Sequence, residues 1–101
     1  MDRVTTLTET VRSVVSSYAT RGYNGNGEPS KFYYVENMQE NVFSVIGPYD
    51  PAVKHAHLIL MVRIVNDEVI VEQDKTSISV RDELKSAGIP GRQIRLAWHH
   101  K

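Results

Sequence analysis

Hydrophobic residues near the start of the chain recur every three or four positions. The residues with this spacing are Val4, Leu7, Val11, Val14, Val15 and Tyr18. Such spacing places them on one face of a helix. Asp2 suits a helix cap, and Thr6 with Glu9 suits a capping box one turn later. The pattern predicts a helix over about Val4–Tyr18, ended by Gly22.

The next part of the chain has the pattern of strands and turns. Tyr23–Ser30 is rich in turn-forming residues and predicts a surface loop. Lys31–Glu36 and Val42–Ile46 are rich in aromatic and β-branched residues, which favour strands. The two segments predict a hairpin. Gly47–Pro51 contains two prolines and predicts a break in the sheet, because proline lacks the amide proton that a central strand uses.

A second hairpin is predicted farther along the chain. His57–Val65 is a long alternating segment, and Glu68–Gln73 is its returning partner. Asn66 and Asp67 tolerate positive φ and suit a tight turn between them. The residues expected to share one face of the first strand are Leu58, Leu60, Val62 and Ile64.

The last third of the chain predicts a short helix and a closing strand. Thr76 is a natural N-cap for a helix that runs to about Ala87 and stops at Gly88. Its apolar contacts are expected from Val80, Leu84 and Ala87. Ile94–Trp98 alternates as a short strand.

The order of these elements is helix, strand, strand, strand, strand, helix, strand. Hairpins imply antiparallel pairing, and each helix needs a surface on which to bury its apolar stripe. We therefore predict an α+β fold, an antiparallel sheet of about five strands with two helices packed on it. The 101 residues are expected to form one domain, residues 1–101.

Composition narrows the function classes. The chain has no cysteine, which excludes disulfides, cysteine-based zinc sites and thiol catalysis. Twelve basic residues balance twelve acidic ones, whereas proteins that bind DNA mainly through phosphates usually have a basic excess. The longest apolar run, Leu58–Val62, is far shorter than the ~20 residues that cross a bilayer. We expect a cytoplasmic protein that does not act at a membrane.

Two groups of polar residues are candidates for chemistry. His55 and His57 would point the same way on a strand and could bind a metal with Asp50 or Asp74, or they could be ordinary surface histidines. Gln73 and Asp74 lie where a strand ends and a helix follows, so they could form a polar site or serve turn and capping roles. No metal, no cofactor and no catalytic residue is predicted.

A third group suggests an interaction surface. Tyr33 would face opposite to Phe32 and Tyr34, so one set packs under a helix and the other is free for a protein interface or, alternatively, for base stacking. A basic edge could include Lys85, Arg92, Arg95 and Lys101. The residues predicted to form an interaction surface are Tyr33, Gln73, Asp74, Arg92 and Arg95.

The second half of the chain resembles a known family. His57–Asp74 resembles the strand, tight turn and strand of the XisI family, ending in its Gln-x-Asp motif at Gln73 and Asp74. Ala87–Pro90, with the sequence Ala-Gly-Ile-Pro, and Ile94–Trp98 are similar to the family's helix end and closing strand. The resemblance is specific over about Ala56–Trp98. The usual Trp- and Gly-rich turn after the second strand and the basic, aromatic tail are not matched.

The resemblance implies a role as an excision controlling factor for the fdxN element of heterocyst-forming cyanobacteria. Members are accessory proteins that commonly pair with a nuclease-like XisH-type partner, while a site-specific recombinase performs the DNA chemistry. It thus implies a non-enzymatic regulator that acts through protein contacts, with DNA reached indirectly. A homo-oligomer is compatible with this. The alternatives are a direct DNA-binding accessory protein and a small metal-dependent enzyme that uses His55 and His57.

Overall fold

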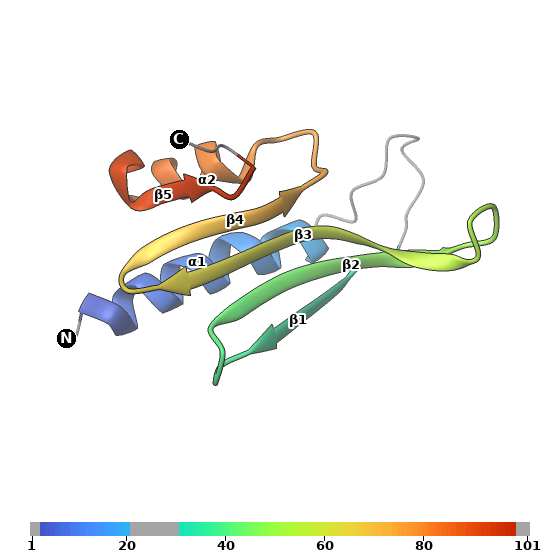
Figure 1. The fold of residues 1–101 in the computed structure, drawn as a ribbon, viewed down its shortest axis with the longest axis horizontal. Coiled ribbons are helices and arrows are strands. Elements are labelled where there is room, and N and C mark those ends of the chain that lie inside the picture. Colours follow the sequence, from blue (N-terminus) through green and yellow to red (C-terminus); the bar gives the residue numbers. More distant parts are fainter. Residues whose placement is uncertain (1–2, 21–30, 99–101) are drawn as a thin grey trace.

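The computed structural model describes residues 3–20 and 31–98. These residues form two α-helices and a five-stranded sheet, arranged as in Figure 1. The elements in chain order are α1 (Arg3–Thr20), β1 (Tyr33–Asn37), β2 (Val42–Asp50), β3 (His55–Val65), β4 (Glu68–Asp74), α2 (Val80–Ser86), the 3-10 turn η1 (Gly91–Gln93) and β5 (Ile94–Leu96). This order confirms the predicted one. None of the helices in the described residues has the length and apolar character needed to span a membrane.

The sheet is mixed, so the prediction of an antiparallel sheet is wrong for its last strand. The strands lie in the order β1-β2-β3-β4-β5, and each of the first three pairs is antiparallel. β5 runs parallel to β4, with Val69 opposite Ile94 and Val71 opposite Leu96. The cause is α2, which carries the chain back along β4 so that β5 starts at the same end as β4, as parallel neighbours require.

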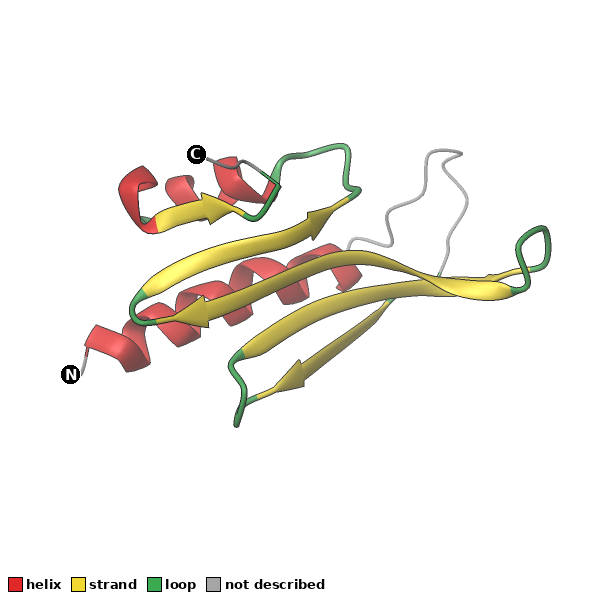
Figure 2. Ribbon diagram, viewed as in Figure 1, coloured by secondary structure: helices red, strands yellow, loops and turns green. Residues whose placement is uncertain are grey.

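Both helices lie on one face of the sheet, and the core is between them and that face. In Figure 2, α1 runs behind β3 and is visible between β3 and β4, and it contacts β2 and α2 on that side of the sheet. Side chains from every layer are buried there. The fully buried ones are Val11, Val15, Phe43, Val45, Leu60, Val62, Val69, Val71, Val80 and Leu84. The predicted α+β layering is confirmed.

Helix α1 buries the stripe that the spacing predicts. Leu7, Val11, Val15 and Tyr18 are all buried. The Tyr18 hydroxyl donates to the Ile78 carbonyl at 2.8 Å, which ties the end of α1 to the segment before α2. The helix already begins at Arg3, so Thr6 lies inside it and cannot cap it. Asp2 and Gly22 lie outside the described residues.

The predicted break at Gly47–Pro51 is wrong, because β2 continues to Asp50. The pairing of β2 with β3 shifts register between Ile46 and Tyr49, so Pro48 lies at an irregularity, where a strand tolerates proline. Residues 47–57 form a hairpin that extends past the end of β1 (Figure 1), and we call them the hairpin arm. A second shift turns Ile59, and not Leu58, against the core.

The predicted cap of the second helix is also wrong. Helix α2 begins at Val80, and Ser79 is its N-cap, with its hydroxyl accepting from the Asp82 backbone N–H at 3.4 Å. Val80 and Leu84 are buried as predicted, whereas Ala87 is exposed. Thr76 lies upstream, where its side chain bonds to Asp74.

Candidate functional site

Gln73 and Asp74 hold the chain together where β4 ends. One Asp74 carboxylate oxygen accepts from the backbone N–H and the hydroxyl of Thr76, at 2.9 and 2.5 Å. The other oxygen accepts from the Val80 backbone N–H at 2.9 Å. The Gln73 side-chain amide donates to the Leu58 carbonyl on β3. Both side chains are thus hydrogen-bonded to backbone groups of the same protein. This corresponds to the turn and capping role.

The histidines lie on the hairpin arm. His55 and His57 point the same way from β3, with ring centroids 5.1 Å apart. His57 Nε2 lies 2.9 Å from an Asp50 carboxylate oxygen, and His55 Nδ1 lies 2.7 Å from the Ala56 carbonyl. Asp74 is not part of this cluster. Across residues 3–20 and 31–98, no three His, Cys, Asp or Glu side chains are placed to hold a metal ion together.

The contact between His57 and Asp50 gives a pH prediction. The hydrogen bond from His57 and the backbone N–H of Ala52 lower the pKa of Asp50 below its ordinary value. A lowered folded-state pKa means that the pair's stabilisation is present at neutral pH and is lost as the pH falls through that pKa. We expect His57→Ala to raise the pKa of Asp50, measured by NMR titration of its carboxyl carbon. His55→Ala is the matched control, and an equal rise in both variants would contradict the assignment.

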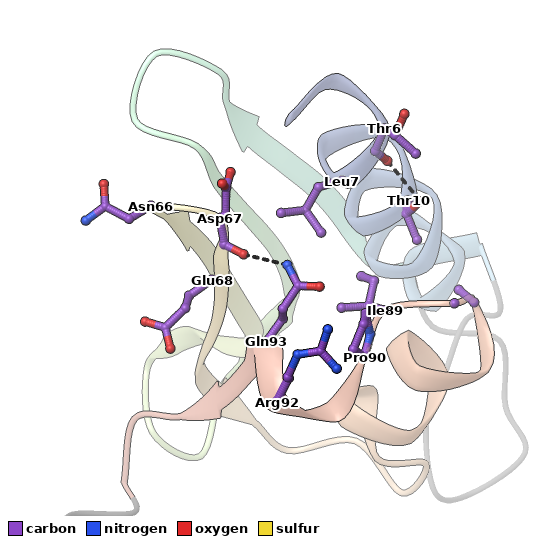
Figure 3. A pocket seen from close by; sticks show the side chains of 12 residues that line it. Thr6, Leu7, Thr10, Asn66, Asp67, Glu68, Ile89, Pro90, Arg92 and Gln93 are labelled. Atoms are coloured by element: carbon purple, nitrogen blue, oxygen red, sulfur yellow. Dashed lines mark hydrogen bonds between the residues drawn. The ribbon is translucent and has the colours of Figure 1, made fainter. Parts of the chain in front are cut away.

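A recess of about 690 Å³ lies at the end of the molecule where α1 begins (Figure 3). Its walls are α1, the turn between β3 and β4, and the loop after α2. Asn66 and Asp67 form that turn with positive φ, as predicted. The Gln93 side-chain amide donates to the Asp67 carbonyl at 2.9 Å, and Arg92 lies at the lower side of the recess. Among the described residues that line it, the groups able to act as acid, base or nucleophile are the Asp67 and Glu68 carboxylates and the Thr6 and Thr10 hydroxyls. Glu68 lies 3.8 Å from Arg95 on β5, and the Thr10 hydroxyl donates to the Thr6 carbonyl at 2.9 Å.

The face of the sheet opposite the helices is a further candidate surface, and we call it the open face. Adjacent strands place its side chains in rows, with Val35 beside Ser44 and Met61. Tyr33 and Val35 are 49% and 47% exposed, and the Lys31 ammonium group lies 5.6 Å from the Tyr33 ring centre. The prediction that Tyr33 faces away from Phe32 and Tyr34 is confirmed, because those two pack against the core.

The open face changes from apolar to charged across the sheet. Beyond Met61, the Arg63 guanidinium bonds to the Glu72 carboxylate at 2.6 Å. Arg95 on β5 lies 3.8 Å from Glu68 on β4. Because each of these arginines faces a carboxylate, the described part of this face offers no unopposed basic stripe for phosphates.

The structure therefore separates the five predicted interaction residues. Tyr33 and Arg95 lie on the open face, at opposite sides of the sheet. Arg92 lines the end recess, and Gln73 and Asp74 bond to the backbone. The predicted basic edge stays a prediction, since the Lys85 side chain lies along Gly91, next to Arg92, and Lys101 is outside the described residues. Sequence reasoning missed Val35 and Met61, although alternation from Tyr33 would have found Val35.

Comparison with known proteins gives the family. A family model described as XisI protein matches residues 1–101. The chain belongs to the XisI family. The predicted resemblance is confirmed, and it extends over the whole chain beyond Ala56–Trp98. No curated protein matches the sequence.

Solved structures agree with membership of the XisI family. The crystal structure of the fdxN element excision controlling factor XisI from Anabaena variabilis ATCC 29413 is 25% identical, with a TM-score of 0.78, and the match covers 98% of this chain and 95% of that one. A XisI-like protein from the same strain is 14% identical, with a TM-score of 0.81 over 97% of this chain and 89% of that one. The second likeness shows a shared fold. This XisI-family chain is therefore similar to an excision controlling factor along its full length.

Proposed function

We propose that this chain is a non-enzymatic accessory protein that acts in programmed DNA rearrangement by binding a XisH-type protein on its open face. In this role it assists a site-specific recombinase complex, and DNA is contacted by the partners. The XisI family membership and the likeness to an excision controlling factor support a role in programmed DNA rearrangement. The choice of the open face rests on the contacts and exposure of this chain's own residues.

The observation that carries the proposal is the apolar half of the open face. Tyr33 and Val35 are about half exposed and lie beside Ser44 and Met61, with no described helix over them. Protein interfaces combine an apolar, Tyr- and Met-rich centre with a polar rim. The Arg63–Glu72 pair supplies such a rim on the neighbouring strands. Charges that are already paired favour a protein partner over a phosphate backbone.

The bonding of the polar candidates supports a role without catalysis. Asp74 and Gln73 bond to the protein's own backbone, and His57 bonds to Asp50 on the exposed arm. General acid-base chemistry needs such groups to converge on a substrate pocket. The end recess is lined by two carboxylates, Asp67 and Glu68, but Glu68 lies 3.8 Å from Arg95, and neither Asp74 nor His57 is among the described residues that line the recess.

The proposal is tested by measuring the affinity for a XisH-type protein with calorimetry. Tyr33→Ala and Met61→Glu are expected to weaken binding about tenfold or more, since buried tyrosines are frequent hot spots and a carboxylate in an apolar interface is desolvated. Val53→Glu is the matched control, because Val53 is 47% exposed but lies at the tip of the hairpin arm. Unchanged affinity in both open-face variants, or no binding by the parent chain, would reject the proposal.

A further inference from the structure

The outer edge of strand β1 is a free sheet edge. β1 pairs with β2 on one side and is the first strand in the sheet order, so none of the described strands pairs with its other side (Figure 1). Among the described residues, no hydrogen bond reaches the backbone of Tyr34 or Glu36 from outside the sheet. An edge with unpaired N–H and C=O groups is a template for another strand.

The direction of the edge groups follows from one hydrogen bond. The Ser44 hydroxyl on β2 donates to the Val35 carbonyl at 3.1 Å, so the Val35 carbonyl points toward β2. Backbone groups of successive residues in a strand point to alternate sides. The N–H and C=O groups of Tyr34 and Glu36 therefore point outward, away from the sheet.

Two other edges of this sheet carry features that hinder strand addition. β5, at the opposite edge, is only three residues long and contains Arg95. Where β2 extends beyond β1, it contains Gly47 and Pro48, and Pro48 has no amide donor. β1 has the sequence Tyr-Tyr-Val-Glu-Asn, without proline, glycine or lysine. Proline and lysine are among the usual protections of an edge, and β1 has neither; its one charged side chain, Glu36, is paired with Arg12 on α1.

The strand is also complementary to itself. If two copies of β1 run antiparallel about an axis at Val35, the outward groups of Tyr34 in one copy meet those of Glu36 in the other. On the helix side, Tyr34 of one copy then lies opposite Glu36 of the other. Glu36 already accepts from Tyr34 at 2.6 Å and from Arg12 at 2.9 Å, so its charge is balanced. On the open face, the two Val35 side chains meet at the axis.

We infer that this edge binds a second copy of the chain, joining two five-stranded sheets into one through antiparallel β1 strands. The occupant is a second copy because the outward groups, the Tyr34–Glu36 pairs and the central valines all match under one two-fold axis. The two open faces become continuous across the axis. This pairing is independent of the proposed XisH-type partner, and its measurement needs the chain alone.

The test places opposite charges at Val35, on the two-fold axis, in two separate variants. The molecular mass is measured by light scattering after size-exclusion chromatography. The parent chain is expected to have twice the 11.5 kDa mass of one copy. Opposed residues at the axis are about 4.5 Å apart between Cα atoms, so like charges there repel strongly. Val35→Lys and Val35→Glu should each run as single copies, with dissociation constants raised roughly tenfold or more. An equimolar mixture of the two variants should regain the double mass.

Val53→Lys is the matched control, since Val53 has the same 47% exposure as Val35 and lies on the hairpin arm. It should keep the double mass. A parent chain with the mass of one copy at its highest soluble concentration would overturn the inference. So would a Val35→Lys variant that keeps the double mass, or a mixture that stays as single copies. Thermal melts of each variant confirm that the domain is folded.

Discussion

Replacing Phe43 with alanine is expected to lower the free energy of unfolding by about 3–5 kcal/mol. Phe43 is fully buried on β2, beneath α1 and beside Val62 of β3. Removing its ring leaves a cavity between the helix and the central strands, which neighbouring side chains refill only in part. Domains of this size are stable by only about 5–15 kcal/mol, so much of the margin is lost. Urea unfolding followed by circular dichroism measures the change.

Tyr49→Ala is the matched control for this prediction. Tyr49 is an aromatic residue on the same strand, but it is 63% exposed on the hairpin arm. Its loss should cost less than about 1 kcal/mol, the range of strand propensity and surface effects. Equal losses in the two variants would mean that α1 does not cover β2 at Phe43.

The elements with strong local periodicity could be predicted from the sequence. Val11 and Val15 in α1, and Leu60 and Val62 in β3, are buried as their spacing indicates. Their pattern depends only on the repeat of a helix or a strand, and a buried face repeats it residue by residue. The turn at Asn66 and Asp67 is equally local, because these residue types tolerate positive φ.

The features that were predicted wrongly depend on contacts distant in the sequence. The direction of β5 is set by the path of α2 across the sheet, which no local pattern records. β2 passes through Gly47 and Pro48 because β3 remains beside it after a register shift. Thr76 and Ser79 are both good N-cap residues, and Asp74 makes the difference by bonding to Thr76 and to the Val80 amide.

Only the part of the candidate surface that depends on local alternation could be predicted from the sequence. Tyr33 could be assigned to the face opposite Phe32 because alternation within one strand decides it. Met61 joins Tyr33 on that face only through the pairing of three strands, which follows from register and not from composition. The sequence assigns Gln73 and Asp74 to the interaction surface, because the sequence pattern of a polar residue at a strand end is the same in two cases. The side chain can bind a partner, or it can bond to the backbone of the same protein.

Asp74→Ala is expected to lower the free energy of unfolding by about 2–4 kcal/mol. The substitution removes the acceptors for the Thr76 N–H and the Val80 N–H, and one of the two acceptors of the Thr76 hydroxyl, which also contacts the Ile78 carbonyl. Hydrogen bonds to a charged acceptor contribute about 1.5–3 kcal/mol each when buried, and less here because Asp74 is only partly buried. Urea unfolding measures the total, and hydrogen exchange at the Val80 amide measures the local loss.

Asp74→Asn tests whether the loss of stability comes from the start of α2. Asparagine has one acceptor oxygen in place of the two carboxylate oxygens. It can therefore accept from Thr76 or from the Val80 N–H, but not from both. Its loss of stability should fall between those of the parent and the alanine variant, with faster exchange confined to the start of α2. Because Val80 and Leu84 are the buried residues of that helix, loosening its first turn exposes part of the core. Unchanged exchange at Val80 in the alanine variant would show that Ser79 alone is enough to begin the helix.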